Sequence, residues 1–249
     1  AIMKTMLVLS MGALLLAGTL SAQTPVPEWQ AGVDKVKTLI QSNPAQASEE
    51  AGELLKGKNK KNVDLVTSVA HVYLDAGKIT EAQEYLAMAK KANNKDPKVS
   101  VLEGDIALAQ KNIGQACQLY EQAIYFDPNC KEAYLKYAQA YKSASPTQAI
   151  EKLEQLKAVD PNCLEADREL AEVYYSGNRF GKAVEMYTKF IDTPLATEDD
   201  MLKYAFALFL NHDFEKSLQV AQKGLQKNAR HAAFNRLVMY NNTDLKRYE

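Results

Sequence analysis

The chain repeats a pattern at intervals of about 34 residues, and this period limits the folds open to it. A small residue recurs with steps of 34, 34, 33 and 34 residues, at Ala70, Gly104, Ala138, Ala171 and Ala205. A second small residue follows 12 positions later, or 11 in the third unit, at Ala82, Ala116, Ala149, Ala183 and Ser217. Such a period is typical of repeat proteins, in which each unit packs on its neighbours.

Each unit predicts two helices joined by a polar turn. An aromatic or apolar residue lies three positions after most of the first small residues, at Tyr73, Tyr141, Tyr174 and Leu208. The composition, with only 11 Gly and 8 Pro, favours helix over strand. Prolines mark the ends of the second helices, at Pro97, Pro128, Pro161 and Pro194. Ser145-Pro146 predicts a helix start with a capping hydroxyl and a proline at the first helical position.

Period, helix pairs and terminal proline together resemble the tetratricopeptide repeat (TPR). The resemblance covers about residues 61–249 and implies an all-α fold. It implies an α-solenoid, a right-handed superhelix of helix-turn-helix pairs, with the first helices lining a concave face. An ordinary helical bundle with accidental periodicity is the rival interpretation.

The sequence divides into three expected parts. Residues 1–22 are expected to be a signal peptide, and residues 23–60 a degenerate N-terminal helical hairpin. About five repeats are expected in 61–249, at approximately 63–96, 97–130, 131–163, 164–197 and 198–231. The first helix of a truncated sixth repeat is expected to follow them.

The N-terminal segment has the pattern of a secretory signal. Lys4 precedes an apolar run over 6–20, and a region of small residues ends near Ala22. The run is shorter than the roughly 20 residues of a membrane span, so a membrane anchor is the lesser alternative. Ala1-Ile2 precede Met3 and resemble an upstream start or a cloning remnant. We therefore expect export to the periplasm, or the extracellular space, of a Gram-negative bacterium, with no membrane span in the mature chain.

The motif Asp-Pro-Asn-Cys occurs twice, ending at Cys130 and Cys163. We interpret it as the boundary between consecutive repeats. Asn129 and Asn162 are expected to be N-caps, with the glutamates three residues later completing capping boxes, at Glu132 and Glu165. Equivalent sites in stacked units lie about 10 Å apart, too far for a disulfide, so no disulfide is expected there or at Cys117.

The residues offer no catalytic motif. The chain has 30 basic and 31 acidic residues, a balance that gives no sign of a nucleic-acid partner. Gly-rich phosphate loops and the HExxH, GxSxG and CxxC motifs are missing from the sequence, and three histidines are scattered along it. We expect no enzyme activity, no catalytic residues, no metal and no cofactor.

The candidate binding residues lie on the first helices, at helical spacing around the small residues. Thr67, His71, Val101 and Asp105 depart from the Lys/Asn pattern with which some TPR co-chaperones clamp a carboxylate, so that specificity is not expected. A polar middle section fits an extended peptide, or else a solvated face with local ion pairs. Phe206 and Phe209 fit an anchor for a partner helix, or burial against the next repeat. The expected partner-binding residues are His71, Asp105, Gln139, Lys142, Arg168, Glu172, Tyr175, Phe206 and Phe209.

The expected function is a non-catalytic protein–protein interaction scaffold of the bacterial cell envelope, which binds a partner peptide or protein on the concave face. One alternative is a glycan-binding or assembly accessory, since Tyr174, Tyr175 and Trp29 offer aromatic surfaces for sugars. Another is the repeat arm of a larger protein whose activity lies in a missing C-terminal part.

Overall fold

The protein is described by a computed structural model covering residues 25–246. The expected signal peptide over 1–22 lies outside the described residues. Within them the chain forms thirteen α-helices and one short 3₁₀ helix, and no strand. In order, these are α1 (Gln30–Ser42), α2 (Pro44–Leu54), η1 (Gly57–Lys61), α3 (Val63–Asp75), α4 (Ile79–Asn93), α5 (Pro97–Ala109), α6 (Ile113–Phe126), α7 (Lys131–Tyr141), α8 (Pro146–Val159), α9 (Leu164–Ser176), α10 (Phe180–Phe190), α11 (Glu198–Leu210), α12 (Phe214–Lys227) and α13 (Ala232–Asp244).

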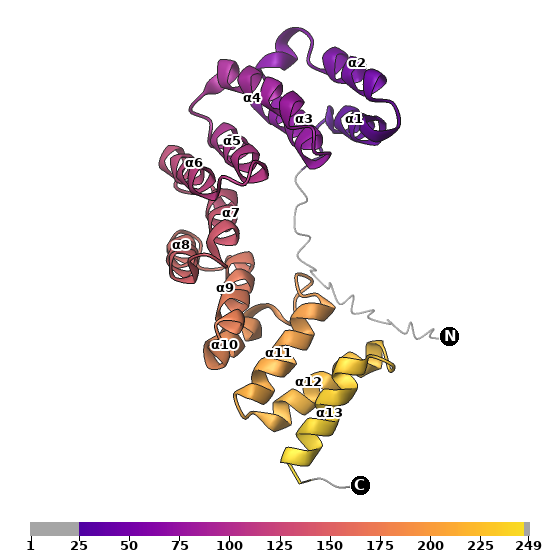
Figure 1. Cartoon of the computed structure of the whole chain (residues 1–249), viewed down its shortest axis with the longest axis vertical. Coiled ribbons are helices and arrows are strands. Elements are labelled where there is room, and N and C mark those ends of the chain that lie inside the picture. Colours follow the sequence, from indigo (N-terminus) through magenta and orange to yellow (C-terminus); the bar gives the residue numbers. More distant parts are fainter. Residues whose placement is uncertain (1–24, 247–249) are drawn as a thin grey trace, which may run out of the picture.

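The helices pair with their sequence neighbours, and the pairs stack into a curved array (Figure 1). From α3 to α10 the first helix of each pair lies on the inner side of the curve, and the second lies on the outer side. The predicted all-α solenoid is confirmed. Side chains of α3, α5, α7, α9 and α11 are therefore the ones available to line an inner face.

Close approach of paired helices explains the periodic small residues. Every member of both series is buried, from Ala70 and Ala82 in the first unit to Ala205 and Ser217 in the fifth. At Gly104 the space is tightest, because an added Cβ would lie 2.5 Å from Cε1 of the buried Tyr120. The sequence period thus records the positions where one helix backbone meets the side chains of its partner.

The turns inside the pairs share an uncommon backbone conformation. In four of these turns one residue has a positive φ, and the residues concerned are Gly77 (76°), Lys111 (64°), Asn178 (57°) and His212 (64°). Lys246, which follows α13, has a similar φ of 55°. The turn of the third unit, which is one residue shorter, has no such residue. Gly adopts this region without a steric penalty and Asn at a modest one, so local strain falls mainly on Lys111, His212 and Lys246.

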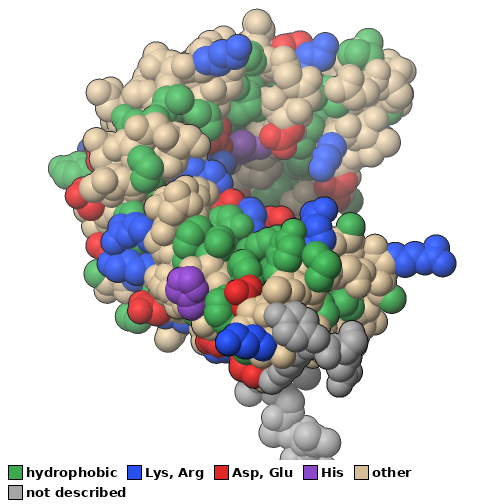
Figure 2. All heavy atoms as spheres, turned by 60° about the horizontal axis from the view of Figure 1, so that its bottom comes forward, with side chains coloured by type: hydrophobic (Ala, Val, Ile, Leu, Met, Phe, Trp, Pro, Cys, Tyr) green, Lys and Arg blue, Asp and Glu red, His purple; other side chains and the backbone are tan. Residues whose placement is uncertain are grey.

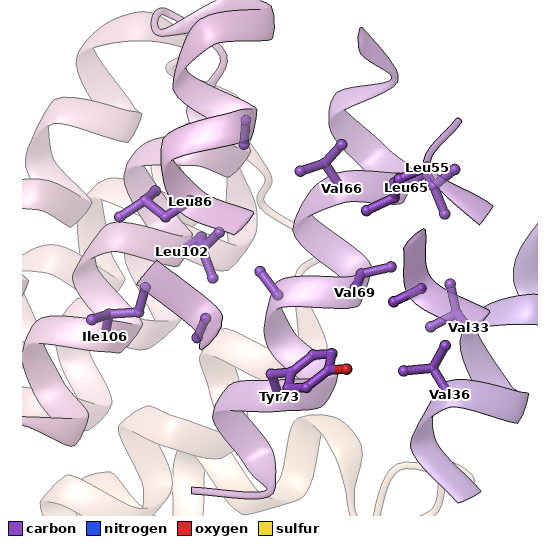
Figure 3. Packing of buried hydrophobic residues seen from close by; sticks show 14 of the residues in the cluster. Val33, Val36, Leu55, Leu65, Val66, Val69, Tyr73, Leu86, Leu102 and Ile106 are labelled. Atoms are coloured by element: carbon purple, nitrogen blue, oxygen red, sulfur yellow. The ribbon is translucent and has the colours of Figure 1, made fainter. Parts of the chain in front are cut away.

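The leading hairpin shares a core with the repeats. Val33 and Val36 of α1 face Leu65, Val69 and other apolar side chains of the first repeat (Figure 3). Further along the chain, the buried side chains of the described residues fall into three more clusters, centred on α5–α7, α7–α11 and α11–α13. The core is therefore a chain of clusters running along the solenoid, as nearest-neighbour packing requires.

The predicted helix starts at the repeat boundary are wrong by one residue. The N-caps are Cys130 and Cys163, not Asn129 and Asn162, and neither cysteine makes a side-chain capping bond. The aspartate of each motif explains the shift, because Asp127 Oδ1 accepts the backbone N–H of Asn129 at 2.9 Å and closes the turn before the helix.

The expected capping boxes are wrong as well. Glu132 lies 3.6 Å from Lys136 Nζ, and Glu165 accepts from Lys131 Nζ at 2.8 Å, so both glutamates make ion pairs along or between repeats. At Ser145 the expected N-cap position and the following proline are confirmed, but the hydroxyl makes no capping bond.

All three cysteines are free thiols in the structure. Cys117 and Cys163 are buried, and Cys130 is partly exposed. Burial raises the pKa of the Cys117 thiol to about 11, and it also raises the pKa of Cys130 and Cys163. The reactive thiolate form is therefore disfavoured at neutral pH at each position.

Candidate functional site

The inner side of the solenoid carries most of the residues expected to bind a partner. Figure 2 shows a hollow bounded by the curved chain, with acidic and basic side chains on its walls and hydrophobic side chains gathered beside it at the C-terminal end. The expected residues do not form one continuous site. They fall into an N-terminal network, a charged pocket in the middle and an aromatic group near the C-terminal end.

The N-terminal network centres on the carboxylate of Asp105, which is partly buried. Its Oδ2 lies 2.9 Å from His71 Nε2 and 2.9 Å from Lys136 Nζ, and its Oδ1 accepts from the Tyr120 hydroxyl at 2.7 Å. His71 Nδ1 lies 2.9 Å from the carbonyl oxygen of Thr67. Helices α3, α5, α6 and α7 are thereby joined through a single side chain.

The hydrogen bonds of His71 call for a charged imidazolium. Both ring nitrogens face oxygen atoms that only accept hydrogen bonds, so both must carry a proton to satisfy them. Burial lowers the pKa of His71, but the hydrogen bond and negative charge of Asp105 outweigh it and raise the pKa above its usual value. Burial likewise raises the pKa of Asp105, but His71, Lys136 and Tyr120 reverse this and lower it. The charged forms of His71 and Asp105 thus favour each other within the network.

A pocket of about 290 Å³ adjoins this network. The side chains of Trp29, Asp64 and Lys98 line it together with His71, and Lys98 forms an ion pair with Asp64. Trp29 is the N-cap of α1 and packs partly buried against the core. Packing thus covers part of the Trp29 ring, one of the aromatic surfaces that the sequence offers for sugars.

The middle of the inner face holds a charged pocket of about 270 Å³ between α7, α9 and α11. We call it the central pocket, and its lining residues are Lys142, Arg168, Glu169, Glu172, Asp199, Asp200 and Lys203. Three of the expected residues therefore line one cavity. A fourth, Gln139, lies next to it, because its Nε2 donates to Glu169 Oε1 at 2.8 Å.

Ion pairs across neighbouring repeats organise the central pocket. Arg168 contacts Asp200 through two nitrogens, with Nε–Oδ1 at 3.2 Å and Nη2–Oδ2 at 3.0 Å. Lys203 Nζ contacts Glu172 Oε1 at 2.8 Å and Asp199 Oδ2 at 2.9 Å. These pairs hold their side chains in fixed positions, because Arg168–Asp200 and Lys203–Glu172 each join two different helices.

Lys142 differs from the other cations of the central pocket. It is the C-cap residue of α7, it is partly exposed, and it has no ion-pair partner among residues 25–246. A carboxylate brought into the pocket therefore finds in Lys142 a cation that is not already engaged.

The aromatic group lies towards the C-terminal end. Tyr175 packs on Phe180 with ring centroids 5.8 Å apart, and Phe209 packs on Phe214 and Tyr240 at 5.5 and 6.1 Å. Phe206 and Phe209 lie partly buried against the last core cluster. Packing thus occupies much of their surface, while Tyr240 on α13 remains 41% exposed.

Tyr174, another aromatic residue that could stack on a sugar, is unavailable on this face. It is only 5% exposed, and the Arg179 guanidinium lies 4.8 Å above its ring centroid. Its surface is therefore already covered by the protein.

The sequence prediction missed the partners of the expected residues. The missed charged partners are Lys136, Asp199, Asp200 and Lys203. Lys136 and Lys203 each lie two positions before the small residue of their unit, which is Ala138 or Ala205. Asp200 replaces an apolar residue of other units, where Leu65, Val99, Ala133 and Ala166 are buried. A charge in an otherwise apolar row was the available signal.

Neither a metal centre nor a membrane-spanning helix is present in the described part of the chain. No group of three or more His, Cys, Asp or Glu side chains within residues 25–246 is arranged to hold a metal ion. No helix in that same range combines the length and apolar character needed to cross a membrane.

Comparison with known proteins agrees with this geometry. Residues 70–130 and 139–194 match the sequence model of the tetratricopeptide repeat. The chain is a TPR protein. No curated protein sequence matches it.

Solved structures of similar shape cover most of this TPR chain. PilW, a widely conserved type IV pilus biogenesis factor, has a TM-score of 0.64 at 16% identity and aligns over 84% of this chain and 97% of its own. PilF of Pseudomonas aeruginosa has a TM-score of 0.62 at 16% identity, over 83% and 95%. YrrB, a TPR protein with an unusual peptide-binding site, has 0.55 at 12% identity, over 75% and 96%. At such identities the likeness shows the fold alone.

Proposed function

We propose that this TPR protein is a non-catalytic scaffold that binds an extended segment of a partner protein along its inner face, at the central pocket. The observation that carries the proposal is Lys142, an unpaired cation beside a set of fixed ion pairs. A peptide carboxylate would pair with Lys142. Backbone amides and cationic side chains of the peptide would meet Glu169 and Glu172 on the same wall.

The mixed charge of the central pocket favours a peptide of mixed polarity over a strongly charged ligand. Its lining carries three basic and four acidic side chains. The positions of these groups are set by cross-repeat contacts such as Arg168–Asp200, so little side-chain entropy is lost on binding. The partly exposed Tyr240 and Phe209 lie further along the solenoid and offer apolar contacts to the same segment.

The family and the similar structures support a binding role. TPR proteins bind protein or peptide partners, and YrrB, a protein of the same fold, has a peptide-binding site. PilW, as a biogenesis factor of the type IV pilus, serves the building of a larger assembly. By analogy, the proposed role is recruitment or organisation of a partner and not chemical conversion of a substrate.

The proposed setting is the bacterial cell envelope, with export to the periplasm. The sequence of residues 1–22, with Lys4 before an apolar run and a small-residue region, motivates this part of the proposal. Fractionation of cells that express the chain from residue 1, followed by intact-mass measurement, tests it. Cleavage near Ala22 and recovery with the periplasmic fraction are expected, and an uncleaved chain in the cytosol contradicts export.

The binding proposal is tested by placing a photo-crosslinking residue at the exposed position 139, beside the central pocket with Lys142 intact, and identifying the products formed in envelope fractions by mass spectrometry. A specific partner should be captured through one segment, and Arg168→Glu or Tyr175→Ala should weaken the capture. The control is a crosslinker at position 37, since Lys37 is exposed on α1 and has no ion-pair partner in the described part of the chain. Equal products from positions 139 and 37 would reject the central pocket as the binding site.

A further inference from the structure

A cluster of lysines lies on the short helix η1, away from the inner face. Four of the six residues in KGKNKK (56–61) are lysine, although the chain as a whole has a net charge of −1. Helix η1 joins the leading hairpin to the first repeat and lies beside α4, at the N-terminal end of the solenoid (Figure 1). Positive charge is thus concentrated where the outer helices begin.

The local structure fixes these lysines in place. Gly57 adopts a φ of 60°, which lets the chain turn into η1. Asn59 Nδ2 donates to the Leu54 carbonyl at 2.9 Å, and Asn62 Oδ1 accepts from the backbone of Leu65 at 3.2 Å. Both ends of η1 are therefore tied to neighbouring helices, and the lysine side chains project from a positioned backbone.

The lysines border a pocket of about 410 Å³ between η1 and α4. Lys60 and Lys61 form one side, and Glu84 and Lys91 of α4 lie on the other. Side chains of Ala87 and Met88, also on α4, supply apolar surface. The pocket has the volume for one or two large apolar side chains and is surrounded by three positive charges and one negative charge.

These lysines lack the partners that other lysines of the region have. Lys56 pairs with Glu53, and Lys90 pairs with Glu103 at 2.6 Å. Among residues 25–246, in contrast, no acidic group lies within ion-pair distance of Lys60, Lys61 or Lys91, nor of the neighbouring Lys58. Their charges repel one another, and an acidic ligand would relieve that repulsion.

We propose that this pocket binds an acidic segment of a partner protein, in which an apolar side chain is flanked by aspartate or glutamate. The apolar side chain would enter the space beside Ala87 and Met88, while the flanking carboxylates would pair with Lys60, Lys61 and Lys91. A concave pocket of this size fits a projecting side chain better than it fits a lipid surface, which presents no such projection. The site differs from the central pocket, so both can be occupied at once.

Fluorescence anisotropy tests this proposal by measuring the binding of a labelled synthetic peptide, Gly-Glu-Asp-Glu-Leu-Asp-Glu-Gly, to the purified protein. Saturable binding is expected, weakened about tenfold or more in Lys60→Glu/Lys61→Glu and weakened by added salt, because the interaction is electrostatic. Two matched peptides, one with Gln and Asn for the acidic residues and one with Gly for Leu, should bind more weakly. Lys37→Glu, a charge reversal at an exposed and unpaired lysine of α1, is the control and should leave binding unchanged.

Ala87→Gln distinguishes the contribution of the apolar pocket to peptide binding from that of the lysine charges. Ala87 is exposed on α4, so glutamine there preserves the helix and the net charge but fills the pocket. Loss of peptide binding in this variant supports the apolar contact, and unchanged binding contradicts it. Binding that survives Lys60→Glu/Lys61→Glu overturns the proposal. The proposal is also overturned if the protein sediments with phosphatidylglycerol vesicles but does not bind the peptide, because this result indicates that the lysines bind a lipid surface.

Discussion

Replacing Asp200 with alanine removes a buried carboxylate that connects two repeats. Its side chain is only 4% exposed, although it lies in the first turn of α11. Asp200 Oδ2 accepts from the backbone N–H and the hydroxyl of Thr197, both at 2.8 Å, and this completes a capping box. The same carboxylate pairs with Arg168 of the preceding repeat. Asp200→Ala therefore weakens both the start of α11 and the interface before it.

The two contributions can be estimated separately. Loss of the capping bonds costs about 1 kcal/mol of unfolding free energy. Breaking a fully buried ion pair costs about 3–5 kcal/mol, and an exposed pair contributes about 0–1 kcal/mol. Arg168 is 38% exposed and can hydrate after the change, so the pair falls between these limits, at about 1–2 kcal/mol. The sum is about 2–3 kcal/mol.

Urea unfolding followed by circular dichroism at 222 nm measures this loss, with Asp199→Ala as the matched control. Asp199 lies in the same helical turn but is 66% exposed, so its replacement should cost no more than about 0.5 kcal/mol. A double-mutant cycle with Arg168→Ala should give a coupling of about 1–2 kcal/mol. A loss equal to that of Asp199→Ala, or a coupling near zero, would refute the reasoning.

Three further changes follow from the structure. His71→Gln should reduce the pH dependence of unfolding free energy: the raised pKa of His71 stabilises the fold fully below about pH 6.5, and this contribution is lost as pH rises through the folded-state pKa. Urea unfolding from about pH 5 to about pH 8 tests this, and an unchanged pH slope contradicts it. Gly104→Ala should lower stability by about 1–2 kcal/mol, because the contact with the Tyr120 ring outweighs the gain in helix propensity, and a rise in Tm would contradict this. Lys111→Gly should raise stability by up to about 1 kcal/mol by relieving a positive φ of 64°, and a fall in Tm would count against the strain argument.

The repeat architecture was accessible from the sequence because packing imposes it at every unit. A small residue is needed wherever two helices approach closely, and Ala70, Gly104 and Ala138 therefore recur at a fixed interval. The turn geometry was not accessible in the same way. Lys111 and His212 adopt a positive φ, a conformation that favours glycine. Because neither residue is a glycine, the sequence does not indicate this backbone conformation.

The candidate site was only partly predictable, because its contacts cross from one repeat to the next at an angle. Helical spacing placed His71 and Asp105 on one face, and the structure joins them at 2.9 Å. Helical spacing did not indicate that Lys136 would complete the cluster, because the offset between stacked helices decides which side chains meet. Arg168 reaches Asp200 for the same reason, across 32 residues and not 34.

The lysines of η1 illustrate a different omission. The sequence contains the basic run KGKNKK, but the net charge of the whole chain is near zero and does not indicate it. Only the structure places Lys60 and Lys61 opposite Lys91 around an apolar pocket. A local count of charge along the chain would have identified the segment, although not its neighbour on α4.

The ion pairs between successive first helices also bear on the mechanics of the solenoid. His71–Asp105 and Arg168–Asp200 each connect adjacent turns of the array on its inner side, so straightening the curve must lengthen them. They resist straightening, and because salt screens partly buried pairs less than exposed ones, this resistance falls only gradually as salt is added. The curvature of the protein, and hence the length of segment it accommodates, should therefore vary with ionic strength. Small-angle X-ray scattering should record a radius of gyration that grows as salt is added.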